Sequence, residues 1–353
     1  MSKEKTQGIS FFEKYLTIWV LLCMATGILI GRFLPGVRSV LESMQICDQN
    51  IPLAILMWIM IYPMMVKIDF KSIKNVGKHP SGIVISSFAS WAIKPFLMFG
   101  LATLFLQVIF SSLIPAGIAS DFVVGAVLLG TAPCTAMVFV WSTLTKGNPA
   151  QTLVQVTVND LLILVLFIPI VQILLGISNV TLPIDILVMS IVLFVAVPLV
   201  AGFLSRVLII KNKGEEYFNN KFLTKFDGAT TIGLLLTLII IFIFQGDIIV
   251  EYPLYVVLIA VPLVLQNIIS FSLTYLVSKA TKLPSDIAAP ASLIAASDFF
   301  ELSVAVAIAL FGVNSPVVLA CTVGVLTEVP VMLLLVKIVN KTKHWFPAPV
   351  SNN

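Results

Sequence analysis

Four carboxylic acids lie inside long apolar runs of the sequence. They are Asp160, Asp298, Glu301 and Glu328, and the rest of the 17 acidic residues lie in polar loops or at the ends of such runs. An ionised carboxylate in an apolar setting is costly, so each of the four should face a cavity, a partner or a proton. Asp298 and Glu301 are three positions apart, which predicts that both lie on one face of a helix. Because neighbouring carboxylates resist double ionisation, we expect this pair to hold and exchange a proton.

One cysteine also has unusual neighbours. Cys134 directly follows Pro133 within the apolar segment LGTAPCTAMVFVW. Proline removes a backbone donor and opens a helix, and a thiol at such a break is a soft ligand for a thiophilic metalloid or metal ion. The alternative is that Cys134 is a small buried hydrophobe, which is the role expected of Cys23 and Cys321 in their uninterrupted apolar runs.

Lys94, in the segment SWAIKPFLM, is a basic residue within an apolar run. It is either the counter-ion of one of the four acids or a side chain whose stem reaches toward the membrane surface. The acids have a plain alternative as well, in which each pairs with Lys94, a backbone group or a buried water. For Asp160 and Glu328 we weigh this alternative equally with a functional role, whereas for Glu301 we favour the functional role.

The composition indicates an integral membrane protein. Apolar residues make up 59% of the 353 residues and charged residues 11%, with a mean hydropathy of +1.08. Soluble domains are nearer a quarter charged, and a helix crosses a membrane with about 20 apolar residues. The predicted spans lie at about 15–34, 51–68, 82–109, 122–142, 150–175, 185–209, 228–245, 253–278, 287–311 and 316–338. The fold class is therefore all-α, with ten transmembrane helices.

Several function classes are disfavoured. The net charge of +4 is small and spread over the loops, which argues against a nucleic-acid partner. The sequence has no CxxC, HExxH or GxxxxGK[ST] motif, so no metal site, cofactor or ATP-driven step is predicted. We expect a transporter and not an enzyme.

Positive charge predicts the orientation. With the N-terminus in the cytoplasm, all but three of the 21 basic residues fall on the cytoplasmic side, the exceptions being Arg32, Arg38 and Lys94. Both termini are then cytoplasmic. The predicted divisions are a cytoplasmic tail at 1–14, a five-helix repeat at 15–175, an extracytoplasmic connection at 176–184, a second five-helix repeat at 185–338 and a cytoplasmic tail at 339–353.

An offset of 167 positions suggests that the two halves are related. It superposes Cys134 on Glu301 and Pro149 on Pro316. An odd number of spans per repeat inverts the second copy in the membrane, and inverted repeats place a substrate site near mid-membrane, where discontinuous helices meet. The fourth and ninth spans are therefore predicted to be broken helices.

Two long motifs, one in each half of the chain and each made of two segments, resemble a known family. The segments APCTAMVFVW (132–141) and LVQVTVND (153–160) in the first half, and SDFFELSVAVAIALFG (297–312) and VGVLTEVPVMLLL (323–335) in the second, are similar to the signatures of arsenite efflux permeases of the arsenical-resistance-three type. IKPF at 93–96 fits as well, and the resemblance covers nearly the whole chain in order. It differs at Asp298, where the family pattern has Asn.

The resemblance implies a ten-span carrier of the bile acid, arsenite and riboflavin transporter superfamily. In that fold, helices four and nine are broken and cross at mid-membrane. Its two parts, called the panel domain and the core domain, move against each other. It implies export of arsenite, and in some members antimonite, in exchange for protons. Cys134 and Glu301 match the family's substrate-site residues. From the sequence itself, Asp298, Asp160, Glu328 and Lys94 are candidates for proton-coupling or supporting roles. The alternative function is a sodium-coupled carrier of organic anions on the same fold.

Overall fold

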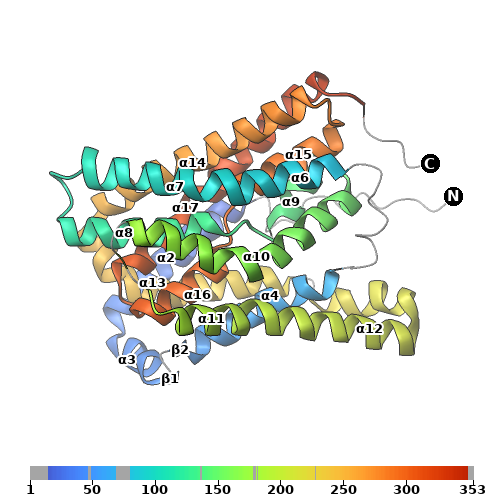
Figure 1. The fold of residues 1–353 in the computed structure, drawn as a ribbon. Helices are drawn as coiled ribbons and strands as arrows, with labels where there is room; N and C mark the ends of the chain where they lie inside the picture. The colour runs from blue at the N-terminus through green and yellow to red at the C-terminus, as the bar shows by residue number, and fades with distance from the viewer. Residues whose placement is uncertain are drawn as a thin grey trace.

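Nearly all of the described chain is helical in the computed structural model (Figure 1). The description covers residues 15–46, 49–68, 80–135, 137–177, 180, 182–226 and 228–348. The α-helices are α2 (Leu16–Phe33), α3 (Pro35–Ser43), α4 (Ile51–Lys67), α6 (Pro80–Phe88), α7 (Lys94–Ala102), α8 (Ala116–Thr131), α9 (Met137–Leu144), α10 (Pro149–Ile177), α11 (Ile184–Ile191), α12 (Val197–Tyr217), α13 (Ala229–Glu251), α14 (Pro253–Ala280), α15 (Ser285–Ala296), α16 (Phe300–Phe311) and α17 (Pro316–Thr342).

Shorter elements join these helices. π-Helical turns lie at Ala89–Ile93, Thr103–Ile109, Val192–Ala196 and Phe218–Phe222, and 3₁₀ turns lie at Leu223–Phe226 and Lys343–Trp345. Within the described ranges, strands occur only as β1 (Gln45–Ile46) and β2 (Gln49–Asn50), which form one short antiparallel pair.

The prediction of an all-helical membrane protein is confirmed. In the described part of the chain, five helical stretches are long and apolar enough to cross a membrane, or six if α2 and α3, which meet at a bend of 96°, count as one span. Shorter apolar helices, among them α8, α15 and α16, lie where further spans are predicted. The number of ten crossings and the division into two repeats stay predictions. The predicted tail at 1–14, Cys47 and residues 349–353 lie outside the described residues.

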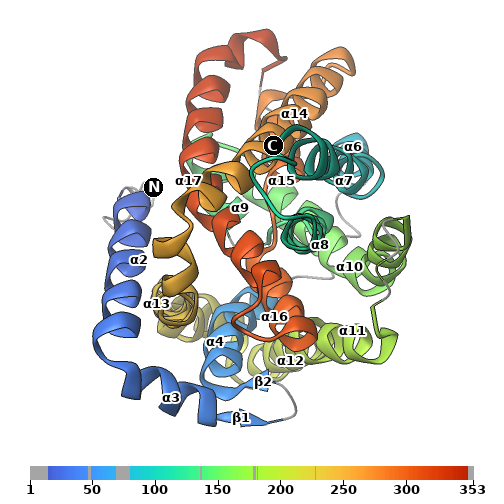
Figure 2. The ribbon, with the colours of Figure 1, turned by 90° about the vertical axis from the view of Figure 1, so that its left-hand side faces the viewer.

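The helices pack in two groups. In the first, α2 packs on α13, and α4 packs on both α12 and α13. In the second, α8 packs on α7, α10 and α17, while α14 packs on α7, α15 and α17. Figure 2 shows the first group in its lower half and α14, α6, α7 and α15 above it. The candidate site residues named from the sequence lie on the helices of the second group, in the breaks next to them or, in the case of Glu301, at the start of α16.

Two glycines explain the close approach of α2 to α13. A Cβ atom on Gly27 would meet the Ile239 carbonyl oxygen at 2.6 Å, and one on Gly31 would meet the Ile243 carbonyl oxygen at 2.5 Å. The four-residue spacing places both glycines on one face of α2, and small residues at this spacing let membrane helices pack backbone to backbone. The two glycines therefore let the backbones of α2 and α13 lie directly against each other.

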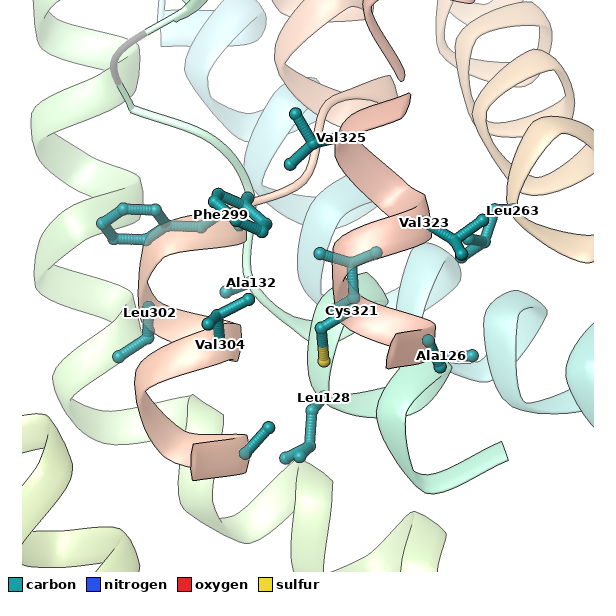
Figure 3. Packing of buried hydrophobic residues seen from close by; sticks show 14 of the residues in the cluster. Ala126, Leu128, Ala132, Leu263, Phe299, Leu302, Val304, Cys321, Val323 and Val325 are labelled. Atoms are coloured by element: carbon teal, nitrogen blue, oxygen red, sulfur yellow. The ribbon is translucent and has the colours of Figure 1, made fainter. Parts of the chain in front are cut away.

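Two of the predicted spans are interrupted as the sequence suggested. α8 ends at Thr131 and α9 begins at Met137, while α15 ends at Ala296 and α16 begins at Phe300. The breaks lie against each other, with Pro133 and Asp298 forming an isolated antiparallel β-bridge. In Figure 3, Ala132 and Phe299 lie close together, and Cys321 of α17 points toward Leu128 of α8. The breaks are therefore enclosed by a tightly packed apolar core.

Candidate functional site

The first break follows from its proline. Pro133 has no N–H to donate, and Ala132 before it leaves the helical conformation with φ −99° and ψ 128°. The backbone N–H of Cys134 then donates to the Ser297 carbonyl oxygen at 3.3 Å, a contact between the two halves of the chain. Backbone groups that would form hydrogen bonds within a continuous helix therefore bond to the second half of the chain instead.

The second break has no proline or glycine. Ser297 is extended, with φ −84° and ψ 150°, and Phe299 has φ −88° and ψ 79°. The Phe299 N–H donates to the Ala132 carbonyl oxygen at 2.9 Å, the mirror of the bond made by Cys134. Pairing with the first break therefore satisfies the backbone groups that this interruption frees.

The two bonds fix the local register between the halves. If Pro133 is superposed on Asp298 and Cys134 on Phe299, which is an offset of 165 positions, each of the two hydrogen bonds takes the place of the other. The offset of 167 still relates Pro149, the first residue of α10, to Pro316, the first residue of α17. The predicted superposition of Cys134 on Glu301 is therefore wrong at the breaks, because two additional residues of the second half lie between its break and α17.

Lys94 is completely buried and joins both breaks. Its Nζ lies 2.7 Å from Oδ1 of Asp298 in an ion pair. The same ammonium donates to the carbonyl oxygens of Ser297, at 2.5 Å, and Ala132, at 3.3 Å. Lys94 is the first residue of α7, directly after the π-helical turn Ala89–Ile93. Of the two interpretations of this lysine, the geometry is that of a counter-ion, and its partner is Asp298.

Glu328 of α17 binds the second break from the other side. Its Oε1 accepts a hydrogen bond from the Ser297 hydroxyl and another from the Asp298 N–H, the latter at 3.2 Å. In the amide orientation that gives partners to both of its polar atoms, Asn267 of α14 donates to Oδ2 of Asp298 at 3.3 Å and to the Ala296 carbonyl oxygen at 2.9 Å. Side chains from α7, α14 and α17 thus hold Asp298 and its neighbours in place.

Glu301 does not share a helix face with Asp298, so that prediction is wrong. α16 begins at Phe300, after the non-helical Phe299, so Asp298 is outside the helix while Glu301 is in its first turn. A carboxylate in the first turn is favoured by the helix dipole. The tertiary pairing of the breaks overrides the helical spacing read from the sequence.

Cys134 lies at the first break in a small apolar cluster with Val138, Val156 and Ile294. Its side chain is 3% exposed. Glu301 lies in the first turn of α16, directly after the second break, and Glu328 binds that break, so the pairing of the breaks places the thiol of the first half at a junction flanked by two acids of the second. In the described part of the chain no group of three or more His, Cys, Asp and Glu forms a metal site.

Asp160 lies apart from these groups. It is 1% exposed on α10, and its Oδ1 has no hydrogen-bond partner among the described residues. Its neighbour Asn159 accepts a hydrogen bond from the Trp91 indole at 2.9 Å and donates to the Gln155 carbonyl oxygen. The described contacts of the Lys94 ammonium include none with Asp160.

Two residues of the site, Ser297 and Asn267, were not singled out from the sequence, nor was Asp286, a buried acid at the other end of α15 from the second break. Ser297 and Asn267 contact the ionised groups directly, and both are polar residues within predicted spans, which is the signal that could have identified them. Asp286 was assigned to a span end but is 6% exposed in the first turn of α15. Its backbone oxygen accepts from the Asn148 N–H.

The chain is similar to known proteins over almost its whole length. A family model described as the sodium bile acid symporter family matches residues 54–252. The arsenical-resistance protein Acr3 of Alkaliphilus metalliredigens is 57% identical over 347 residues, which cover 98% of this chain and 97% of that protein. An uncharacterised transporter of Synechocystis sp. is 44% identical, over 96% of this chain and 91% of that protein. The Acr3 protein of Corynebacterium glutamicum is 33% identical, over 95% and 90% of the two chains.

Proposed function

Because the chain belongs to the sodium bile acid symporter family, and within it to the Acr3 arsenical-resistance proteins, we propose that it exports arsenite from the cytoplasm in exchange for protons. The observation that carries this proposal is the pairing of the two helix breaks, with Cys134 on the first break and Glu301 and Glu328 next to the second. A single thiol supports reversible binding, which a carrier needs. Antimonite is a second candidate substrate, because trivalent antimony is thiophilic in the same way.

Arsenous acid is neutral at pH 7, so its site needs no counter-charge. In the proposed binding step the Cys134 S–H bond and one As–OH bond break, an As–S bond forms, and one water molecule leaves. Attack by water on arsenic reverses the step and restores the thiol. The residues that pack against Cys134 are buried and apolar, and such a setting disfavours the water that reverses the step.

The proton is assigned to Glu301. Its carboxylate lies in the first turn of α16, directly after the break that pairs with the one holding Cys134, so occupancy by a proton and occupancy by substrate influence each other. Alternating access would come from movement of the two helix groups against each other. Asp298 and Glu328, which are held by Lys94 and Ser297, are assigned supporting roles, and Asp160 is a candidate for a separate proton-coupling or structural role.

We also propose that both termini are cytoplasmic. Basic residues gather near the C-terminal ends of α12, α14 and α17, for example Lys213, Lys279 and Lys341, and Figure 1 places these three helix ends on its right-hand side. The positive-inside rule assigns such an end to the cytoplasm.

Arsenite uptake into everted membrane vesicles tests the function. We expect uptake that depends on an imposed proton gradient and not on a sodium gradient. Glu301→Gln keeps the shape of the side chain and removes the exchangeable proton, so proton-driven uptake should fall to the background level. Undiminished uptake by this variant would refute the role of Glu301.

The same vesicles test the alternative function. A sodium-coupled carrier of organic anions would take up an anionic substrate such as a bile acid when sodium is present. Against it, the described site holds three carboxylates and one ammonium, which is an unfavourable lining for an anion. Sodium-driven uptake of a bile acid, with no uptake of arsenite, would establish the alternative.

A further inference from the structure

The ammonium of Lys94 is surrounded by oxygen atoms from both helix breaks. Two are backbone carbonyl oxygens, those of Ala132 and Ser297, and the third is Oδ1 of Asp298. All three lie within 3.3 Å of Nζ, and the side chain is 0% exposed. Carbonyls freed by unwound helices, together with a carboxylate, are the ligands by which transporters bind sodium.

The helices strengthen the attraction for a cation. Ala132 directly follows the last residue of α8, and Ser297 directly follows the last residue of α15. Each carbonyl therefore lies at the C-terminal, partially negative end of a helix. Two such ends and a buried carboxylate meet at one point, which without the ammonium would hold an uncompensated negative charge.

We propose that the oxygen cage of Ala132, Ser297 and Asp298 is a monovalent-cation site that Lys94 fills with its own tethered ammonium. The lysine excludes sodium from this place, so the paired breaks keep their arrangement without a bound ion. Removal of the ammonium should convert the cage into a sodium site. This inference rests on the ion pair and does not depend on the identity of the transported substrate.

The size of the lysine side chain makes the conversion feasible. Lys94→Ala removes the three carbon atoms beyond Cβ and the ammonium, which leaves a space that begins at the backbone of α7 and ends at Asp298. A polar void of this kind admits water, and water can complete the coordination of a small ion. The remaining carboxylate supplies the charge that selects a cation.

Radioactive sodium binding to the purified full-length protein tests the proposal. Lys94→Ala should bind sodium saturably, and its melting temperature should rise with sodium but not with N-methyl-glucamine at equal ionic strength. Lys94→Ala combined with Asp298→Asn should lose both effects, because the carboxylate is gone. Lys337→Ala, which removes an exposed lysine of α17, should behave as the wild type does and show neither effect.

Three results would overturn the proposal. One is a Lys94→Ala protein without sodium dependence, as expected if Asp298 simply takes up a proton. Another is sodium binding that survives in the double variant. The third is sodium binding by the wild-type protein that the Asp298→Asn variant lacks. This measurement can be made even if Lys94→Ala fails to fold. If Lys94→Ala does not fold, Lys94→Gln replaces it: this side chain is shorter than lysine, has no charge and offers an amide oxygen as a further ligand, so it should show the same gain of sodium dependence.

Discussion

The two helix breaks share a backbone arrangement but differ in chemistry. At each break one N–H donates to a carbonyl oxygen of the other, through Cys134 and Phe299. The described side chains of the first break, Pro133, Cys134 and Thr135, carry no formal charge at neutral pH. The second break holds Asp298 and is bound by Glu328. A symmetric backbone thus places a soft ligand and a set of charges side by side.

Because of this difference, we expect the two breaks to have different roles. The first break offers a thiol in an apolar cluster, which is the place proposed for binding a neutral metalloid acid. The second break is held by an ion pair and by hydrogen bonds from three helices. Lys94 belongs to the first half of the chain and neutralises the second break, so neither half completes the site alone. We therefore expect substitutions at the second break to cost stability and substitutions at the first break to cost function.

The largest loss of stability is expected from Lys94→Met in sodium-free buffer. Methionine fills the space of the stem but leaves the Asp298 carboxylate buried without its partner, which costs about 3–5 kcal/mol. Thermal unfolding of the purified protein measures this loss, with Lys337→Met as the control at an exposed position.

The double variant Lys94→Met with Asp298→Leu sharpens this prediction. It replaces the ion pair with apolar side chains, which is often nearly neutral, so most of the lost stability should return. A double variant less stable than either single variant would show that the ion pair itself, and not the unpaired charge, decides the stability of the second break.

A smaller loss is expected from Ser297→Ala. The hydroxyl donates to Glu328, and its removal leaves a buried carboxylate with one fewer donor, at a cost of about 1–3 kcal/mol. Ser292→Ala is the matched control, because Ser292 is equally buried in α15 but donates only to the Ala288 carbonyl oxygen of its own helix. Equal losses in the two variants would mean that the contact with Glu328 contributes nothing specific.

The smallest loss of stability is expected at the first break. Cys134→Ala should cost no more than about 1.5 kcal/mol, because the thiol has only apolar neighbours in its cluster and no ionic partner. Arsenite transport should nevertheless be lost. Cys321→Ala is the control: this thiol is also buried, but it lies on α17 and contacts the Gly125 carbonyl oxygen of α8, and its removal should leave transport intact. Transport retained by Cys134→Ala would end the functional distinction between the two breaks.

The sequence predicts the long helices well and the second break poorly. α10 and α14 begin at prolines and continue as apolar runs, so their observed bounds, 149–177 and 253–280, lie within two residues of those expected. Pro133 likewise indicates the first break. Residues 297–299 contain no helix breaker, and the chain is extended there because it pairs with the first break.

The partner of Lys94 could not be found from local patterns. Asp298 lies in the other half of the chain, and the lysine reaches it only because the breaks cross next to α7. The same holds for Asn267 and Glu328, whose roles depend on the packing of α14 and α17 around the second break. Hydrophobic periodicity gives the helices but not which polar side chains meet between them.

Arsenic X-ray absorption spectroscopy on the purified protein with bound arsenite tests the central claim most directly. The proposed site predicts one sulfur ligand to arsenic in the wild type and in Cys321→Ala, and only oxygen ligands in Cys134→Ala. A sulfur ligand that persists in Cys134→Ala, or a wild-type spectrum with oxygen ligands alone, would contradict the assignment of Cys134 and of the paired breaks as the place where arsenite binds.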